Sequence, residues 1–154
     1  MRAVLLSLIL ILGVAAQARA DFMTALAAYD AGDYAVAFTE WRRLAAQGDA
    51  DSQVALAGLY EAGLGAPRDD RAAARWYRKA ALRGHRIARL NLGSLYAQGR
   101  GVGRDLVRAW YWLGLAAADG SVWARDRQAG VARRMTAVER RRAREMLESA
   151  RPAQ

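Results

Sequence analysis

The stretch GDADSQVALAGLYEAGLGAPRDDRAAARWYRKAALR, residues 48–83, decides the fold, because the 36 residues that follow repeat its pattern. Aligned with residues 84–119, GHRIARLNLGSLYAQGRGVGRDLVRAWYWLGLAAAD, it gives twelve identities at one constant spacing, and Gly120 opens a third unit. A fixed period between about 20 and 50 residues is typical of stacked-repeat architectures. We therefore expect a chain of similar units, each packed against its neighbours.

The first half of each unit predicts a helix that ends in a glycine turn. Leu56 and Leu59 lie on one helical face behind Asp49, whose carboxylate can cap the start of the helix. Gly63 and Gly65 then end the helix, since glycine adopts positive φ at little steric cost. No stretch alternates apolar and polar residues as a half-buried strand would.

The second half of each unit predicts another helix. Asp69 can cap it, Trp76 lies on its expected buried face among alanines, and Gly84 closes it. One such helix pair cannot bury its own apolar face, so the units must stack. The predicted structural repeat positions are Leu56, Leu59, Tyr60, Gly63, Gly65, Asp69, Trp76, Gly84, Leu92, Leu95, Tyr96, Gly99, Gly101, Asp105, Trp112 and Gly120.

The flanks have the pattern of incomplete units, which sets the expected domain organisation. We expect a signal peptide over residues 1–20 and an N-terminal partial repeat over 21–47. Full repeats follow over 48–83 and 84–119, and a degenerate repeat with a basic capping helix fills 120–154. Thr136 and Glu139 form the pattern of a capping box at the start of the last helix. The predicted fold is an all-α solenoid of about eight helices in four pairs.

The segment from Gly48 to Gly84 resembles the Sel1-like repeat, a 36-residue relative of the tetratricopeptide repeat. The Leu-Tyr, Gly-x-Gly, Asp, Ala-x-x-Trp and Ala-Ala-x-x-Gly elements recur in both units, although Gly103 replaces the usual proline and Arg89 the usual glutamine. This resemblance implies a right-handed superhelix with a concave groove lined by the first helices. It also implies an adaptor, scaffold or partner-binding role, often at the bacterial envelope. Some exported family members are stapled by cysteine pairs, but this chain has no cysteine.

The first twenty residues have the pattern of a secretory signal peptide. Arg2 precedes an apolar run over residues 3–16, and Ala18-Arg19-Ala20 supplies a small-x-small cleavage site before Asp21. The run is shorter than the roughly 20 residues that span a bilayer, so we expect cleavage after Ala20 and no transmembrane helix in the mature chain. Retention of the segment as an anchor is the alternative. The predicted location is periplasmic or secreted.

The chain is strongly basic, and most of that charge is arginine. Residues 21–154 carry 22 basic and 15 acidic side chains, a net charge of +7, and Lys79 is the only lysine. Such a surplus favours an anionic envelope surface or an acidic polymer as partner. Nucleic acid is unlikely for an exported chain without a nucleic-acid-binding module. Simple solvation of the last helix, around Arg140–Arg144, is the alternative interpretation.

The sequence offers no reactive centre. His85 is the only histidine and stands at a helix junction, where it fits a cap or a loop side chain. Most aspartates stand at expected helix starts, and Glu40 and Glu61 have no partner at catalytic spacing. The glycine turns lack the strand or the Gly-Lys-Ser/Thr ending of a phosphate loop. We expect no catalytic residue, no metal and no cofactor, so a small hydrolase is the least favoured hypothesis.

A groove that presents one side chain per repeat predicts the partner-binding residues. Positions 53, 89 and 125 share one register, and exposed aromatics are expected on the helix that contains Trp110-Tyr111-Trp112. The predicted partner-binding set is Gln53, Arg86, Arg89, Trp110, Trp123 and Arg125. The favoured function is a non-catalytic adaptor that binds an acidic segment of another envelope protein. The alternative is direct binding of cell-wall glycan or an anionic polysaccharide.

Overall fold

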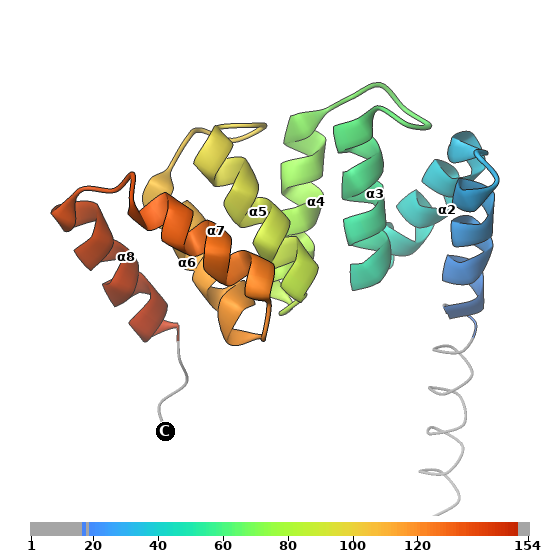
Figure 1. Ribbon diagram of the computed structural model, residues 1–154. Helices are drawn as coiled ribbons and strands as arrows, with labels where there is room; N and C mark the ends of the chain where they lie inside the picture. Colours follow the sequence, from blue (N-terminus) through green and yellow to red (C-terminus); the bar gives the residue numbers. More distant parts are fainter. Residues whose placement is uncertain (1–16, 18, 151–154) are drawn as a thin grey trace, which may run out of the picture. The chain divides into compact units, whose positions relative to one another are not determined.

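The computed structural model describes residue 17 and residues 19–150, and this part of the chain is built of helices joined by short turns (Figure 1). The first helix is described over residues 19–30. It is followed by α2 (Tyr34–Ala46), α3 (Ala50–Ala62), α4 (Asp70–Leu82), α5 (Arg86–Gln98), α6 (Leu106–Ala118), α7 (Val122–Ala132) and α8 (Ala137–Ser149). The described residues contain no strand. The expected all-α helical-repeat fold is confirmed.

The helix bounds themselves repeat every 36 residues. α2, α4 and α6 begin at residues 34, 70 and 106, while α3, α5 and α7 begin at residues 50, 86 and 122. The last helix breaks this period, because α8 begins at residue 137, five residues before the position 142 that the period would give. The N-terminal flank therefore keeps the full register of the repeats, whereas the C-terminal flank has a shortened connection.

Polar side chains cap the helices where the sequence predicted them. Asp33, Asp49, Asp69 and Asp105 each accept a hydrogen bond from the backbone N–H three residues ahead. Before α5 the same position is occupied by His85, whose Nδ1 accepts from the N–H of Ala88 at 3.3 Å. His85 is therefore a helix cap, and its ring satisfies one of the free donors of the first turn.

The predicted capping box opens α8. The N–H of Thr136 donates to Glu139 at 2.8 Å, and this bond holds the pKa of the Glu139 carboxyl below its usual value. α8 buries Ala143, while Arg140, Arg141, Arg142 and Arg144 are exposed. The arginines of the last helix thus face solvent, which is compatible with both interpretations of the basic surplus.

The first compact unit, residues 1–68, has an aromatic cluster around Trp41. The Trp41 ring is 3% exposed and lies 5.9 Å from the ring of Phe22 and 5.6 Å from that of Tyr29, measured between centroids. Phe38 of α2 meets Tyr60 of α3 edge to face at 5.2 Å. These contacts join the first helix, α2 and α3 through apolar surface, which is the main favourable term in packing.

The predicted signal peptide lies almost wholly outside the described residues, so its cleavage stays a prediction. The proposed cut between Ala20 and Asp21 falls within the first helix. Asp21 pairs with Arg43 of α2 at 2.8 Å, and this hydrogen bond, with a second from Gln17, lowers the pKa of the Asp21 carboxyl. Cleavage would remove Gln17 and leave the Arg43 contact. Among the described residues, no helix has the length and hydrophobicity that a membrane span requires.

The second compact unit, residues 69–154, contains α4 to α8. α5 packs against α4, α6 and α7, and α6 also packs against α7 and α8. α5 and α7 thus lie side by side, with α6 behind α7 in the view of Figure 1. The buried apolar side chains include Leu92, Leu95, Leu106, Trp112, Leu113, Val131 and Ala143.

Two turn glycines lie directly against the start of a neighbouring helix. Gly65 and Gly101 have φ of +70° and +66°, the left-handed region that other residues enter at a cost. A Cβ built on Gly65 would overlap the carbonyl oxygen of Tyr34, and one on Gly101 would overlap that of Asp70. Tyr34 and Asp70 are the first residues of α2 and α4, so each turn rests on the backbone of a helix that precedes it.

One predicted core position is wrong. Trp76 is only half-buried, and the Lys79 ammonium lies 4.0 Å from the centre of its ring, while the next residue, Tyr77, is 2% exposed. A tryptophan face covered by a cation from the following helical turn need not be buried by a neighbouring helix. The equivalent residue in the second repeat, Trp112, is 9% exposed and lies in the core as predicted.

Positions 53 and 89 connect consecutive helices instead of facing a groove. Gln53 Nε2 donates to the carbonyl of Ala45 at 3.2 Å, and Arg89 Nε donates to the carbonyl of Ala81 at 3.2 Å. Both acceptors lie eight residues earlier, in the last turn of the preceding helix. Glutamine and arginine share this register because each has an N–H donor that reaches the same carbonyl.

Replacement of Gly101 by alanine should destabilise the fold by about 2–5 kcal/mol, since it combines left-handed backbone strain with a clash against α4. Gly120→Ala is the matched control, because Gly120 also has positive φ, +89°, but a Cβ there would meet no atom within 4 Å. The control should cost about 1 kcal/mol. Urea unfolding followed by circular dichroism measures both, and equal losses would contradict the role assigned to the close contact.

The hydrogen bond from the side chain at position 89 to the Ala81 carbonyl should survive a change to glutamine but not to leucine. Arg89→Gln retains a donor for the Ala81 carbonyl and should lower the free energy of unfolding by less than about 1 kcal/mol. Both variants lose the ion pair with Asp119, but Arg89→Leu also removes the donor to the Ala81 carbonyl, so a loss of about 1–2 kcal/mol is expected for it. Thermal unfolding of the two variants separates these cases. The same stability in both would contradict a stabilising role of the hydrogen bond to Ala81.

Candidate functional site

The residues that shared the predicted binding register do not form one surface. Gln53 is 3% exposed, so as a partner-binding residue it is a wrong prediction, and its amide belongs to the helix packing described above. Arg89 is partly buried, and its Nη1 lies 2.6 Å from Oδ2 of Asp119. Only Arg125 is fully on the surface. The 36-residue period identifies equivalent positions, but at positions 53 and 89 the side chains bond to the preceding helix.

Arg86 and Arg89 join two turns of the second unit. The Nη1 of Arg86 donates to the backbone carbonyl of Asp119 at 3.3 Å, while Arg89 pairs with the carboxylate of the same residue. The turn between α4 and α5 is thereby tied to the turn between α6 and α7. Both arginines have a structural part in this contact, and Arg86 remains exposed.

The three consecutive aromatics of α6 differ in burial. Trp112 is buried, whereas Trp110 and Tyr111 are half-buried. The Trp110 carbonyl accepts a hydrogen bond from Gln128 Nε2 of α7 at 3.2 Å, and Tyr111 meets Trp112 edge to face. Trp123, at the start of α7, is 74% exposed. Of the two tryptophans proposed to contact a partner, Trp123 is the more accessible.

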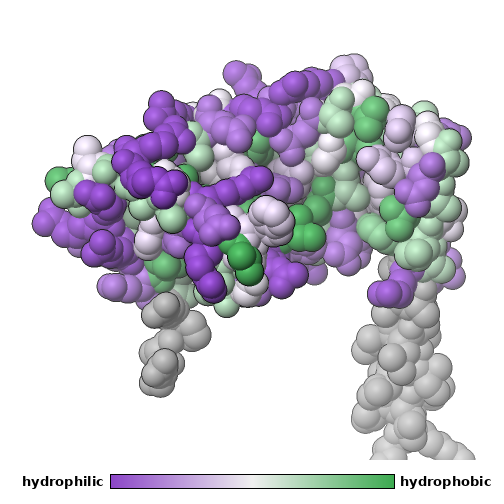
Figure 2. All heavy atoms as spheres, viewed as in Figure 1, coloured by the Kyte–Doolittle hydropathy of each residue, from purple (hydrophilic) through white to green (hydrophobic). Residues whose placement is uncertain are grey.

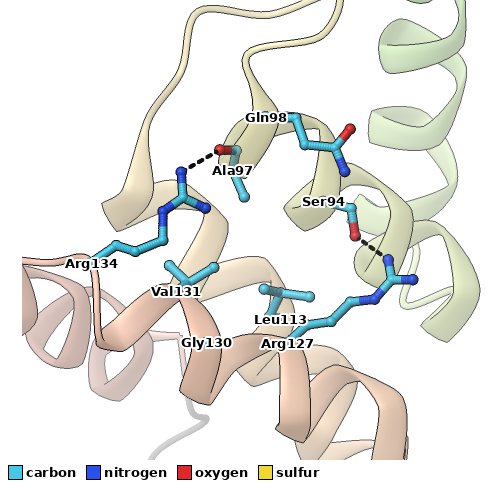
Figure 3. Close-up of a pocket in the computed structure, with 8 residues that line it drawn as sticks. All are labelled: Ser94, Ala97, Gln98, Leu113, Arg127, Gly130, Val131 and Arg134. Atoms are coloured by element: carbon cyan, nitrogen blue, oxygen red, sulfur yellow. Dashed lines mark hydrogen bonds between the residues drawn. The ribbon is translucent and has the colours of Figure 1, made fainter.

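A shallow cavity of about 370 Å³ opens between α5 and α7 (Figure 3). Its floor is apolar, because Leu113 of α6 and Val131 of α7 lie at its base. The remaining lining residues are Ser94, Ala97, Gln98, Arg127, Gly130 and Arg134, and none of the eight carries a carboxylate. We call this cavity the α5–α7 groove.

Two arginines cross the groove from the α7 side to α5, as Figure 3 shows. Arg127 Nη1 donates to Ser94 Oγ at 2.7 Å, and Arg134 Nη2 donates to the carbonyl oxygen of Ala97 at 3.3 Å. Arg127 belongs to α7, whereas Arg134 lies in the turn that follows its last residue, Ala132. A guanidinium has five N–H donors, so each arginine keeps donors for a further acceptor. The groove therefore combines an apolar floor with two cationic ends.

Sequence reasoning did not select Arg127 or Arg134. Their spacing of seven residues is that of one helical face with Val131 between them, although Arg134 lies just beyond the end of α7. The choice of position 125 as the continuation of 53 and 89 directed attention to a different face of the same helix. A search for cations at helical spacing around a buried apolar residue would have found the groove.

A second cationic surface lies on α4. Arg71, Arg75 and Arg78 line a cavity of about 230 Å³ whose other walls include Leu92 and Tyr96 of α5. The Arg108 guanidinium of α6 lies 5.7 Å from the centre of the Tyr96 ring. Guanidinium groups around an aromatic ring form a site suited to anionic groups, since each can bind a carboxylate or phosphate in a bidentate way.

Carboxylates of this chain pair with arginines or cap helices. Glu40 pairs with Arg43 at 3.1 Å, and the aspartates at helix starts accept backbone hydrogen bonds. In the part of the chain that the structure describes, no three His, Asp or Glu side chains are grouped as a metal site would require.

Comparison with known proteins agrees with this architecture. The Sel1 repeat family matches residues 50–85 and 87–121. The c5321 protein of uropathogenic Escherichia coli, described as a protective antigen with an SLR fold, is 28% identical with a TM-score of 0.82, over 86% of this chain and 29% of that one. A Sel1 repeat protein from Oxalobacter formigenes is 32% identical with a TM-score of 0.66, over 69% of this chain and 44% of that one.

The cysteine-rich protein B of Helicobacter pylori is 26% identical with a TM-score of 0.55, over 57% of this chain and 66% of that one. This chain thus spans less than half of the first two proteins, and it has no cysteine. The comparison with curated proteins finds none that matches. Two matched repeats, helix bounds with a 36-residue period and a shared solenoid architecture show that the chain is a Sel1-like repeat protein.

Proposed function

We propose that this protein is an exported, non-catalytic adaptor that holds an acidic peptide segment of another envelope protein in the α5–α7 groove. Sel1 repeat proteins are typically scaffolds for protein–protein interaction, which sets the general class. The observation that carries the proposal is the pair Arg127 and Arg134, placed at the two ends of an apolar floor. Binding there would exchange hydrogen bonds within the protein for stronger, charge-assisted bonds to carboxylates.

The spacing of the two arginines suggests the form of the ligand. The side chains of an extended peptide alternate between its two faces, so residues two and four positions apart point the same way. Two carboxylates four residues apart can therefore reach Arg127 and Arg134, while the side chain midway between them lies over Leu113 and Val131, which favours an apolar residue there. The preferred segment is thus an acidic residue, three residues of which the middle one is apolar, and a second acidic residue.

The exported location rests on the N-terminal sequence, with a predicted cut after Ala20. Cell fractionation with mass spectrometry of the mature N-terminus tests this part. A mature chain that begins at Asp21 is expected, and an intact N-terminus in the cytoplasm would contradict it.

Charge reversal at the groove should weaken peptide binding. A fluorescently labelled peptide that contains Glu-Ala-Leu-Ala-Glu between neutral residues serves as the probe, with anisotropy as the measurement. Arg127→Glu with Arg134→Glu should lower the affinity at least about tenfold, because both charge-assisted contacts become repulsive. Arg125→Glu is the matched control, since Arg125 is an exposed arginine of the same helix that does not line the groove.

The comparison between these variants decides the proposal. The control should bind within about twofold of the unaltered chain at physiological salt, where exposed charges are screened beyond about 8 Å. An equal loss in both variants would indicate non-specific attraction to a basic surface, and unchanged binding in the groove variant would refute the site. Unchanged helicity by circular dichroism shows that each variant is folded.

Direct binding of an anionic polysaccharide is the second candidate, and the cavity on α4 favours it. Arg71, Arg75 and Arg78 form a row along one helical face beside Tyr96, which suits repeated acidic groups on a linear chain. Retention on immobilised polygalacturonate should fall at least about tenfold in Arg75→Glu with Arg78→Glu. The Arg127/Arg134 variant should be retained as before. Loss of retention in that variant alone would place the polymer-binding site in the α5–α7 groove and contradict the α4 site.

A further inference from the structure

Four large apolar side chains are exposed at one end of the second unit. Leu82 ends α4, Ile87 lies in the first turn of α5, and Val122 and Trp123 begin α7, with 66%, 49%, 62% and 74% of their surface exposed. Figure 2 shows hydrophobic side chains near the N-terminal end of α7, within a face that is mostly hydrophilic. We call Leu82, Ile87, Val122 and Trp123 the apolar edge. Such a group of exposed apolar residues usually marks a contact surface.

The apolar edge is one site because the two turns that form it are joined. Arg86, next to Ile87, donates to the carbonyl of Asp119, and Arg89 pairs with the carboxylate of that residue at 2.6 Å. Asp119 is three residues before Val122. Ile87 and Trp123 also occupy the same position of consecutive repeats, 36 residues apart, so each extends from the first turn of its helix.

The charges around the apolar edge are mainly positive. Arg86 and Arg125 are exposed beside it, and Arg86 keeps its full charge because its acceptor is a neutral carbonyl. The carboxylate of Asp119 is already paired with Arg89, which leaves Asp126 as the acidic group of the first two turns of α7 that faces solvent. The edge therefore presents apolar side chains within a cationic surround, which is complementary to an apolar layer covered by anionic groups.

We propose that the apolar edge docks this protein on an anionic phospholipid surface, with Trp123 inserted at the level of the headgroups. Tryptophan favours the membrane interface because its ring is apolar and its N–H can still bond to polar groups. Arginines near the surface add attraction to anionic headgroups. The edge lies at helix ends, where its side chains can enter a lipid layer. The α5–α7 groove stays available for a peptide, so this inference goes beyond the proposed adaptor function.

The test reads the position of Trp123 directly. The full chain is mixed with vesicles of phosphatidylglycerol and phosphatidylethanolamine, with or without bromine on the acyl chains, which quenches nearby tryptophans. Quenching of up to one tryptophan in five is expected, since Trp41 and Trp112 are buried and Trp76 and Trp110 half-buried. Trp123→Phe should abolish the quenching. This readout remains valid if the apolar residues 3–16 also hold the chain on the vesicle.

Two further variants test whether the quenching depends on the apolar edge or on any exposed apolar side chain. Leu82→Ser with Ile87→Ser should remove most of the quenching, because Trp123 loses its apolar neighbours in the bilayer. Val138→Ser is the matched control, as Val138 is 65% exposed on α8 but lies outside the edge, and it should be quenched like the unaltered chain. Vesicles of phosphatidylcholine alone should quench less, and equal quenching would contradict the part assigned to the arginines.

Other outcomes would overturn the proposal. Equal quenching in the unaltered chain and Trp123→Phe would place another tryptophan at the membrane, and no quenching in either would exclude insertion. Self-association in sedimentation analysis that is lost in Trp123→Phe, without quenching by lipid, would make the edge an interface between copies. The Arg127/Arg134 variant should retain the quenching, so failure of the adaptor proposal and failure of the membrane proposal are distinguishable.

Discussion

The contact of a turn glycine with the first residue of a preceding helix is the constraint on which this solenoid depends. Gly65 on Tyr34 and Gly101 on Asp70 are the same contact, 36 residues apart. A Cβ at either glycine would overlap a backbone carbonyl, so no larger residue fits at the turn unless the start of the neighbouring helix shifts. Since both partners recur with the period, each repeat meets its predecessor in the same way, and the helix bounds follow with the same spacing.

Gln53 and Arg89 connect the same pairs of helices at their opposite ends. Each bonds to the last turn of the preceding helix, α2 or α4, whereas the turn glycines contact the first residue of that same helix. Neighbouring helices are thus held at both ends, and packing of small and large apolar side chains fills the space between. In the second unit this arrangement leaves α5 and α7 side by side with a shallow depression over Leu113, where a ligand can lie.

Sequence reasoning predicted the features that depend on local helix geometry and missed those that depend on the direction in which a side chain points. Aspartate caps, glycine turns and the burial of Trp112 follow from residue type and spacing along one helix. The burial of Gln53 and the partial exposure of Trp76 depend on how a neighbouring helix or a lysine packs against each face. A period of 36 shows which positions are equivalent, but only the packed helices show whether the equivalent side chains point inward or outward.

The arginine surplus illustrates why composition could not decide the function. Arg89 has its charge paired with Asp119 and its Nε bonded to a backbone carbonyl, so it contributes to packing. Arg127 and Arg134 bond to neutral oxygens across a groove and keep donors for a ligand, whereas Arg140 and its neighbours on α8 face solvent. Arginine thus has three roles in this protein, and the bonding partner of each guanidinium distinguishes them. A carboxylate partner within the protein marks a structural arginine, while a neutral partner beside an apolar floor marks an arginine with charge available for binding.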